Sequence, residues 1–218
     1  MSAHSRNTPN AVARGMWPEG FLALGDSYTI GEGVCEAERW PAQLAALLRD
    51  QGADLGEPRI LAKTGWATDE LSAAIDALET TESLGPYRLV SLLIGVNNQY
   101  CERSLAEYEV QFTALLERAI TFAGGEPAHV LVLAIPDWGV TPFAMQSGRD
   151  RTQIADQLDA FNAAAAHIAE EKGARFVDTA PVSRQRGGEA NMLADDGLHP
   201  SGALYALWAE AALHRLQS

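Results

Sequence analysis

The sequence predicts an α/β protein with a mostly parallel sheet and helices on both of its faces. Short apolar runs alternate along the chain with longer segments in which apolar residues recur at helical spacing. Two of these runs, residues 89–94 (LVSLLI) and 129–135 (HVLVLAI), are almost continuously apolar, which is typical of strands covered on both faces. Alternation of strands and helices requires crossover connections, and these connections give a parallel sheet its two helical layers.

Five apolar runs are predicted as strands: residues 21–25 (FLALG), 59–62 (RILA), 89–94, 129–135 and 175–178 (RFVD). Five helical patterns lie between and after them, over residues 44–48, 71–78, 105–115, 154–168 and 204–211. The third helix has a clear beginning, because Ser104 and Glu107 have the spacing of a capping box. Gly173, after Lys172, predicts the end of the fourth helix.

The length and composition indicate a single domain. The chain has 218 residues, of which 47% are apolar, and this is enough for a sizeable core. The first 19 residues are polar and interrupted by Pro9 and Pro18. We therefore predict a flexible tail over residues 1–19 and one domain over residues 20–218.

The charge and the apolar pattern restrict the classes of partner. The formal net charge is −13, from 29 acidic and 16 basic side chains, which disfavours binding to nucleic acid. No stretch of about 18 or more apolar residues is present, so no membrane-spanning helix is predicted. The N-terminal residues lack the apolar core of a signal peptide, and a cytoplasmic location is expected. The two cysteines, Cys35 and Cys101, fit reduced thiols, although a single bridge between their loops is conceivable.

Residues that could support nucleophilic catalysis occur where this fold places its ligands. In an open parallel sheet, ligands bind beyond the carboxyl ends of the strands. Ser27 follows the first predicted strand directly, in the sequence Gly25-Asp26-Ser27-Tyr28. Before the last helix, Asp196 precedes His199 by three residues.

This pair could activate the serine. A serine hydroxyl is a weak nucleophile unless a base lies within hydrogen-bond reach. A carboxylate three residues before a histidine can accept the Nδ1 proton, which leaves Nε2 free to take a proton from Ser27. Taken singly, each feature also has a structural interpretation: Ser27 as a helix N-cap, Asp196 as the cap of a turn, and His199 as an exposed loop residue.

Two further loops supply hydrogen-bond donors. Gly65 follows the second predicted strand, and Asn97 follows the third. A backbone N–H at Gly65 and the side-chain amide of Asn97 are the chemical groups that stabilise the oxyanion of an acyl-transfer transition state. A turn glycine and a loop asparagine are the structural alternatives. The common location of all these residues at one sheet edge favours the catalytic interpretation.

The segments GDSYTIGEG, TGWATDEL, LIGVNNQY and DGLHPSG resemble, in this order, the sequence blocks of the SGNH hydrolases, also called GDSL-type esterases and lipases. The resemblance covers residues 21 to about 202. It implies a three-layer α/β/α sandwich of the flavodoxin-like type with five parallel strands. It also implies Ser27 as nucleophile, His199 and Asp196 as its partners, and the N–H groups of Ser27 and Gly65 together with the Asn97 amide as the oxyanion hole.

Two positions depart from the family pattern. Tyr28 stands where the GDSL signature usually has leucine, and Asn98 stands where the third block usually has aspartate. Since Asn97 retains its amide donor, we expect activity to survive the second change. The local hydrogen bonding and pKa environment at Asn98 must differ from that of the family.

Large apolar side chains near these loops are candidates for the wall of a substrate pocket: Trp66, Tyr100, Trp138, Phe143 and Met145. Three of them lie in residues 136–149, which are predicted as a loop outside any regular element. Packing over the helix ends is the structural alternative. Residues 179–200 are likewise predicted to contain no clear element.

The predicted function is a serine ester hydrolase that acts on a small-molecule ester through an acyl-enzyme and needs no cofactor. A metal site built from Asp26, Asp195, Asp196 and His199 is a minor alternative, because the chain lacks the usual spacings of metal ligands. A non-catalytic binder on the same fold is the alternative from another functional class. Thioesterase and carbohydrate deacetylase activities are alternatives within the enzymes.

Overall fold

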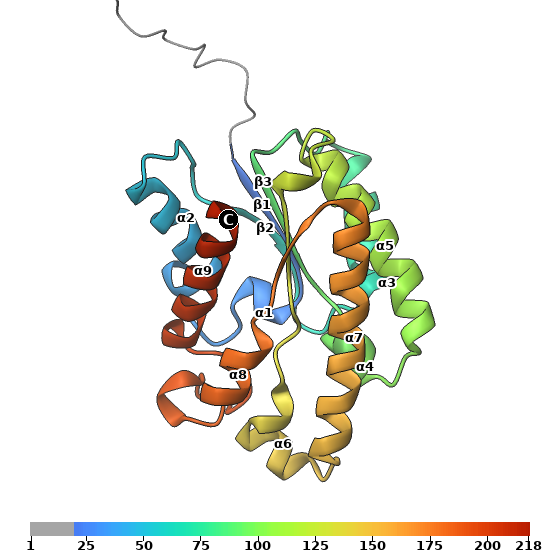
Figure 1. Ribbon diagram of the computed structural model, residues 1–218, viewed down its shortest axis with the longest axis vertical. Helices are drawn as coiled ribbons and strands as arrows, with labels where there is room; N and C mark the ends of the chain where they lie inside the picture. The colour runs from blue at the N-terminus through green and yellow to red at the C-terminus, as the bar shows by residue number, and fades with distance from the viewer. Residues whose placement is uncertain (1–19) are drawn as a thin grey trace, which may run out of the picture.

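The computed structural model describes residues 20–218 and has the α/β architecture that the sequence predicts (Figure 1). The predicted N-terminal tail, residues 1–19, lies outside the described residues. Five parallel strands form one sheet in the order β2-β1-β3-β4-β5, which is the flavodoxin-like order. The strands are β1 (Phe21–Gly25), β2 (Arg59–Ala62), β3 (Leu89–Leu93), β4 (Val130–Leu133) and β5 (Arg175–Val177).

Helices cover both faces of this sheet and complete three layers (Figure 1). On one face, α2 (Trp40–Asp50) and α9 (Gly202–Gln217) pack against each other. On the other face lie α3 (Thr68–Glu79), α5 (Leu105–Phe122) and α7 (Arg151–Lys172). The predicted fold class, a three-layer α/β/α sandwich, is therefore confirmed.

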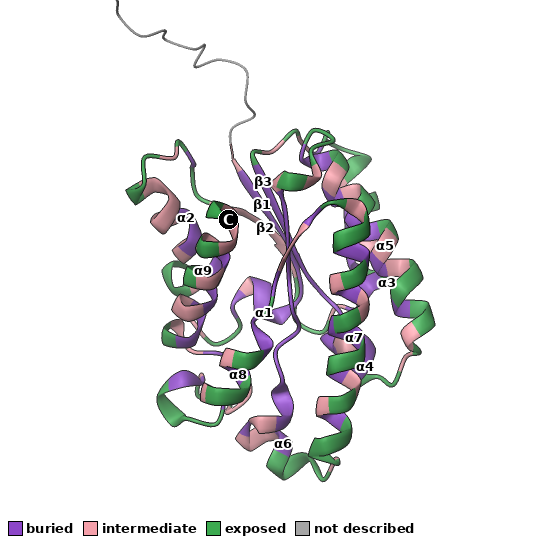
Figure 2. Ribbon diagram, viewed as in Figure 1, coloured by how far each residue is buried: buried purple, intermediate pink, exposed green. Residues whose placement is uncertain are grey.

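The core lies on both sides of the central strands. Every residue of β1, β3 and β4 is buried, whereas the edge strand β2 is half-buried throughout (Figure 2). This difference explains why β3 and β4 have the most continuous apolar sequences. Rigid central strands give the loops at their carboxyl ends a fixed relative position.

Several short helices lie in the connections. They are α1 (Ser27–Ile30), α4 (Val96–Tyr100), α6 (Pro142–Ser147), α8 (Ala180–Arg186), and the 3₁₀ helices η1 (Glu36–Glu38), η2 (Pro127–His129), η3 (Trp138–Val140) and η4 (Ala190–Met192). The prediction that residues 136–149 and 179–200 contain no regular element was therefore wrong. Helices of one or two turns are too short to show an apolar period.

Local capping signals agree with the predicted helix ends. The Ser104 hydroxyl accepts the backbone N–H of Glu107 at 3.2 Å, at the beginning of α5. Gly173 adopts a left-handed conformation directly after α7, as expected of a glycine that ends a helix. β4 begins at Val130 and not at the predicted residue 129, because His129 belongs to the preceding 3₁₀ helix.

Two simpler predictions concern the cysteines and the membrane. Cys35 and Cys101 are exposed free thiols, so the conceivable bridge between them is not formed. Between residues 20 and 218, no helix has the length and apolar character needed to cross a bilayer.

Candidate active site

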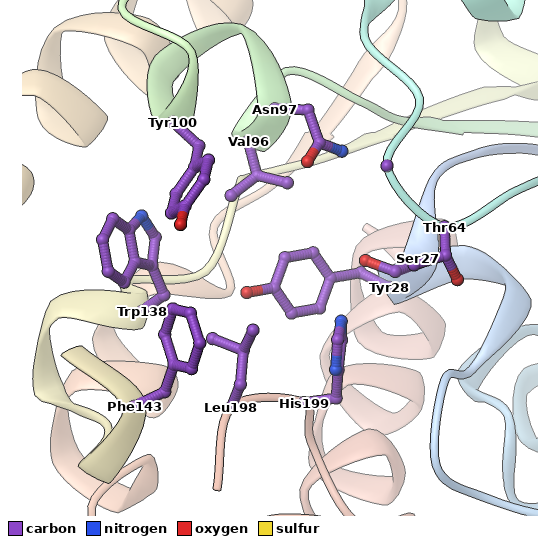
Figure 3. A pocket seen from close by; sticks show the side chains of 11 residues that line it. Ser27, Tyr28, Thr64, Val96, Asn97, Tyr100, Trp138, Phe143, Leu198 and His199 are labelled. Atoms are coloured by element: carbon purple, nitrogen blue, oxygen red, sulfur yellow. The ribbon is translucent and has the colours of Figure 1, made fainter. Parts of the chain in front are cut away.

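A cavity of about 160 Å³ lies at the carboxyl ends of the strands (Figure 3). Each loop there contributes to it: the loops after β1, β2, β3 and β4, and the segment before α9. The residues that line the cavity are Ser27, Tyr28, Thr64, Gly65, Val96, Asn97, Tyr100, Trp138, Phe143, Leu198 and His199. The structure thus brings most of the predicted site residues together in one place.

Ser27 begins the short helix α1, and the backbone before it fixes its place. The carboxylate of Asp26 accepts the backbone N–H of Tyr28 at 3.0 Å and so caps this helix. A Cβ atom on Gly25 would lie 2.4 Å from the carbonyl oxygen of Leu93 on the neighbouring strand, so only glycine fits there. The Ser27 side chain therefore points into the cavity from a closely packed turn.

His199 and Asp196 are joined by a hydrogen bond of 2.5 Å between Nδ1 and Oδ2. The other carboxylate oxygen accepts the backbone N–H groups of Leu198 and His199, each at 2.9 Å. Partial burial opposes ionisation of Asp196, but the hydrogen bonds from His199 and Leu198 outweigh it and lower the pKa of this carboxyl group. A carboxylate that stays ionised keeps the Nδ1 proton in place.

The other ring nitrogen of His199 points toward Ser27 (Figure 3). The imidazole is buried, with 7% of its residue surface exposed. In the described part of the chain, no hydrogen bond joins the Ser27 hydroxyl to this ring. Such contacts are often loose in unliganded sites and tighten when substrate binds.

Two residues with N–H donors line the cavity from neighbouring loops. Gly65 has a φ of +87°, a conformation that favours glycine, and its N–H has no acceptor among the described residues. The Asn97 amide nitrogen donates to the carbonyl oxygen of Trp66 at 2.8 Å. A side-chain amide has two N–H bonds, so one of them stays available to the cavity. The backbone N–H of Ser27 likewise has no acceptor among residues 20–218.

The buried side chain of Asn98 links the loop that carries Asn97 to Thr68, at the beginning of α3. It is fully buried; its oxygen accepts the backbone N–H of Thr68 at 3.1 Å, and its nitrogen donates to the Thr68 hydroxyl at 2.6 Å. That hydroxyl donates in turn to Gln111. An amide thus fills the place of the aspartate that is usual in the family, with both of its polar atoms paired.

Aromatic side chains form the far wall of the cavity. The ring centroids of Tyr100 and Trp138 lie 5.5 Å apart, and those of Trp138 and Phe143 lie 6.1 Å apart. The indole nitrogen of Trp138 is fixed by a hydrogen bond of 2.9 Å to Gln99. The predicted position of these three residues in a pocket wall is the one that the structure gives them.

Two residues predicted for this wall lie elsewhere. Trp66 is half-buried and packs against the hydrophobic core, and its backbone oxygen is the acceptor for Asn97. Met145 is 60% exposed on α6 and does not line the cavity. The sequence showed that both are large apolar residues in the right loops, but the direction of a side chain in a turn depends on backbone angles that periodicity does not reveal.

Four lining residues were not predicted: Tyr28, Thr64, Val96 and Leu198. All four are direct neighbours in sequence of a predicted site residue. That adjacency was the available signal.

In the described part of the chain, no group of three or more His, Cys, Asp or Glu side chains could hold a metal ion.

Asp26 is an unusual neighbour for the cavity. It is completely buried, and burial raises its pKa to about 7. The carboxylate oxygen Oδ2 has no hydrogen-bond partner among the described residues. Its Oδ1 accepts the N–H of Tyr28, as described above.

Solved structures with the same fold were found by comparison of the coordinates. A crystal structure of TesA is 21% identical with a TM-score of 0.68, and the match covers 91% of this chain and 98% of that chain. A member of the lipolytic protein G-D-S-L family from Veillonella parvula is 17% identical, with a TM-score of 0.67 and coverage of 90% and 97%. Axe2, an acetylxylan esterase from Geobacillus stearothermophilus, is 20% identical, with a TM-score of 0.66 and coverage of 93% and 95%.

At these identities the likeness establishes the fold alone. A search of curated proteins found no match. The sequence profile of one family, however, matches residues 23–207, which is most of the chain and includes every loop of the cavity. This protein belongs to the GDSL-like lipase/acylhydrolase family.

Proposed function

We propose that this protein is a serine hydrolase of small-molecule carboxylic esters, with Ser27 as nucleophile and His199 and Asp196 as its proton-transfer partners. One observation carries the proposal: a single cavity contains the Ser27 side chain, an imidazole whose Nδ1 is bound to a carboxylate, and N–H groups without acceptors. A non-catalytic binding site would not need these three features together.

The reaction follows from this arrangement. Ser27 Oγ attacks the ester carbonyl carbon while His199 Nε2 accepts its proton, and the carbonyl oxygen becomes an oxyanion. The N–H groups of Ser27 and Gly65 and the amide of Asn97 stabilise that oxyanion. His199 then returns the proton to the departing alkoxide as the C–O bond breaks, which leaves an acyl-enzyme. Water, deprotonated by His199, releases the acid and restores Ser27.

The size of the cavity favours a short acyl group. Its volume of about 160 Å³ is below the range of roughly 300–1,000 Å³ that holds drug-sized ligands. The cavity wall is formed mainly by aromatic and aliphatic side chains, which suits an uncharged group. We therefore propose acetyl to butanoyl esters as the preferred substrates.

The deciding experiment compares wild type with Ser27→Ala on p-nitrophenyl acetate, butanoate and octanoate. The expected result is turnover by the wild type, greatest for the short esters, and loss of nearly all turnover in a folded Ser27→Ala variant. Hydrolysis that persists in this variant would assign the chemistry to another nucleophile. Absence of turnover in folded wild type would contradict the proposed ester hydrolysis.

A further inference from the structure

The side chain of Tyr28 places a hydroxyl group in the part of the cavity that Trp138, Phe143 and Leu198 line, where Tyr100 also carries a hydroxyl group. The ring of Tyr28 lies between Ser27 and the aromatic wall, and the hydroxyl points toward the side where Trp138 and Leu198 lie (Figure 3). Only 3% of the residue is exposed. Among residues 20–218 the hydroxyl has no hydrogen-bond partner, since only the backbone N–H of Tyr28 donates a bond. The hydroxyl oxygen is not among the fully buried polar atoms that lack a partner, so it keeps a surface open to the cavity and is free to bind a ligand atom.

The ring is held firmly in this orientation. It contacts the imidazole of His199, with ring centroids 5.5 Å apart, and the indole of Trp208, with centroids 6.1 Å apart. Trp208 is fully buried in α9. The Tyr28 backbone is fixed as well, because it lies in the turn capped by Asp26. The hydroxyl is therefore preorganised, and a substrate atom that meets it loses little free energy to ordering the protein.

The surroundings make this hydroxyl a neutral donor. Burial raises the pKa of Tyr28 above its ordinary value, and the negative charges of Asp26, Asp196 and Asp137 raise it further. The phenol therefore keeps its proton at neutral and mildly alkaline pH. The ionised carboxylate of Asp196 disfavours an anionic group at this position, because like charges repel strongly in a buried site. A neutral oxygen is the acceptor that fits.

We infer that Tyr28 determines specificity by donating a hydrogen bond to a neutral oxygen atom, of an ether, hydroxyl or carbonyl group, in the part of the substrate that the cavity binds beside the scissile ester. This inference rests on the proposed function and adds a substrate class to it: short oxygen-bearing esters. The leucine that is usual at this position has no polar atom and could not make this bond. Tyr28 would select such substrates through binding, next to the nucleophile but without a part in proton transfer.

The test uses pairs of esters that differ only by exchange of a CH₂ group for an oxygen atom. The acyl pairs are p-nitrophenyl butanoate with methoxyacetate, and p-nitrophenyl pentanoate with 3-methoxypropanoate. The alcohol pair is butyl acetate with 2-methoxyethyl acetate. For each pair the ratio of kcat/KM, oxygen ester over carbon ester, is measured in wild type and in Tyr28→Phe. Differences in intrinsic reactivity cancel when the two ratios are divided.

We expect the ratio to fall roughly tenfold in Tyr28→Phe for at least one pair, because a buried hydrogen bond of ordinary strength is lost. The pair that responds identifies whether the acyl group or the alcohol occupies the cavity. Tyr100→Phe is the matched control, since it removes another phenol hydroxyl from the same cavity, from a residue that is 37% exposed. A ratio unchanged within twofold in all pairs, or a change confined to Tyr100→Phe, would overturn the inference.

A binding measurement separates this inference from the proposed function. Ser27→Ala and Ser27→Ala/Tyr28→Phe are titrated by calorimetry with the same esters, which neither protein cleaves. For each pair, the ratio of the dissociation constants of the oxygen ester and the carbon ester is compared between the two proteins. A tenfold shift in this ratio supports the role of Tyr28 even if wild type hydrolyses none of the esters. An unshifted ratio refutes that role even if ester hydrolysis is demonstrated. Tyr28→Leu, with the residue usual in the family, provides a second variant and should shift the ratio in the same direction.

Discussion

The carboxylate of Asp196 binds His199 at two points, through Nδ1 of the ring at 2.5 Å and through its backbone N–H at 2.9 Å. The first bond fixes the tautomer, and the second fixes the turn that carries the ring. Both are possible because the two residues are three positions apart. The pKa of Asp196 is lowered by these bonds, so the carboxylate remains charged when His199 gains a proton.

Replacement of Asp196 by asparagine should therefore impair catalysis and not folding. An amide can turn its NH₂ group toward the ring and favour the wrong tautomer of His199, so we expect kcat to fall by up to about 10⁴-fold with little change in KM. Steady-state kinetics with a p-nitrophenyl ester measure this. Asp195→Asn is the matched control, because the same change one residue away leaves the bond to His199 intact. Equal losses in the two variants would contradict the assigned role.

Replacement of Asn97 by alanine should reduce kcat by about 10²–10³-fold, because one donor to the oxyanion is lost. The Asn97 amide also donates to the Trp66 carbonyl, but that oxygen lies near the surface of a half-buried loop. Stability should therefore change little, which thermal unfolding checks. An unchanged kcat in a folded variant would exclude Asn97 from the transition state.

The next residue should behave in the opposite way. Asn98→Ala removes the partner of both the backbone N–H and the hydroxyl of Thr68, in a fully buried site. We expect the free energy of unfolding to fall by about 1–3 kcal/mol, measured by urea denaturation. Asn98→Asp keeps an acceptor for the Thr68 N–H at the beginning of α3, so its free energy of unfolding should fall by less. A stability loss as large in Asn98→Asp would show that the acceptor oxygen is not the important atom.

The contrast between Asn97 and Asn98 illustrates how far the sequence alone could predict the site. Residues whose chemistry is distinctive, such as Ser27 and His199, could be placed because a parallel sheet gathers its loops at one edge. The fold class was predictable for the same reason: buried strands and amphipathic helices have different apolar periods. The function of Asn98 was not predictable, because its partner Thr68 is 30 residues away and the contact depends on tertiary structure.

The direction of side chains in short helices was the other limit. Met145 and Phe143 lie two residues apart on α6, yet Met145 is 60% exposed while Phe143 lines the cavity. In a helix of six residues no apolar stripe repeats, so the sequence does not show which face is covered. Tyr28 is a related case. The sequence identified it as a departure from the family signature, but only the structure shows its hydroxyl pointing into the cavity.

The buried carboxyl group of Asp26 predicts a specific dependence of stability on pH. Burial raises its pKa from 3.8 to about 7 in the folded protein. The folded state therefore binds the proton more tightly than the unfolded state, and the contribution of this group to stability is fully present below about pH 4. It is lost as the pH rises through about 7. The difference should be on the order of 4 kcal/mol, at about 1.4 kcal/mol for each pKa unit.

Asp26→Asn removes this titration, because an amide stays neutral while its oxygen can still accept the N–H of Tyr28. The Tm of the variant minus the Tm of wild type should therefore be larger at pH 8 than at pH 4. Circular dichroism in matched buffers measures both values. Asp54→Asn, the same change at an exposed residue, serves as the control. Its Tm should differ from that of wild type by the same amount at both pH values. If the difference in Tm between Asp26→Asn and wild type were also the same at both pH values, the buried carboxyl group would titrate as an ordinary aspartate, and the predicted pH dependence would be wrong.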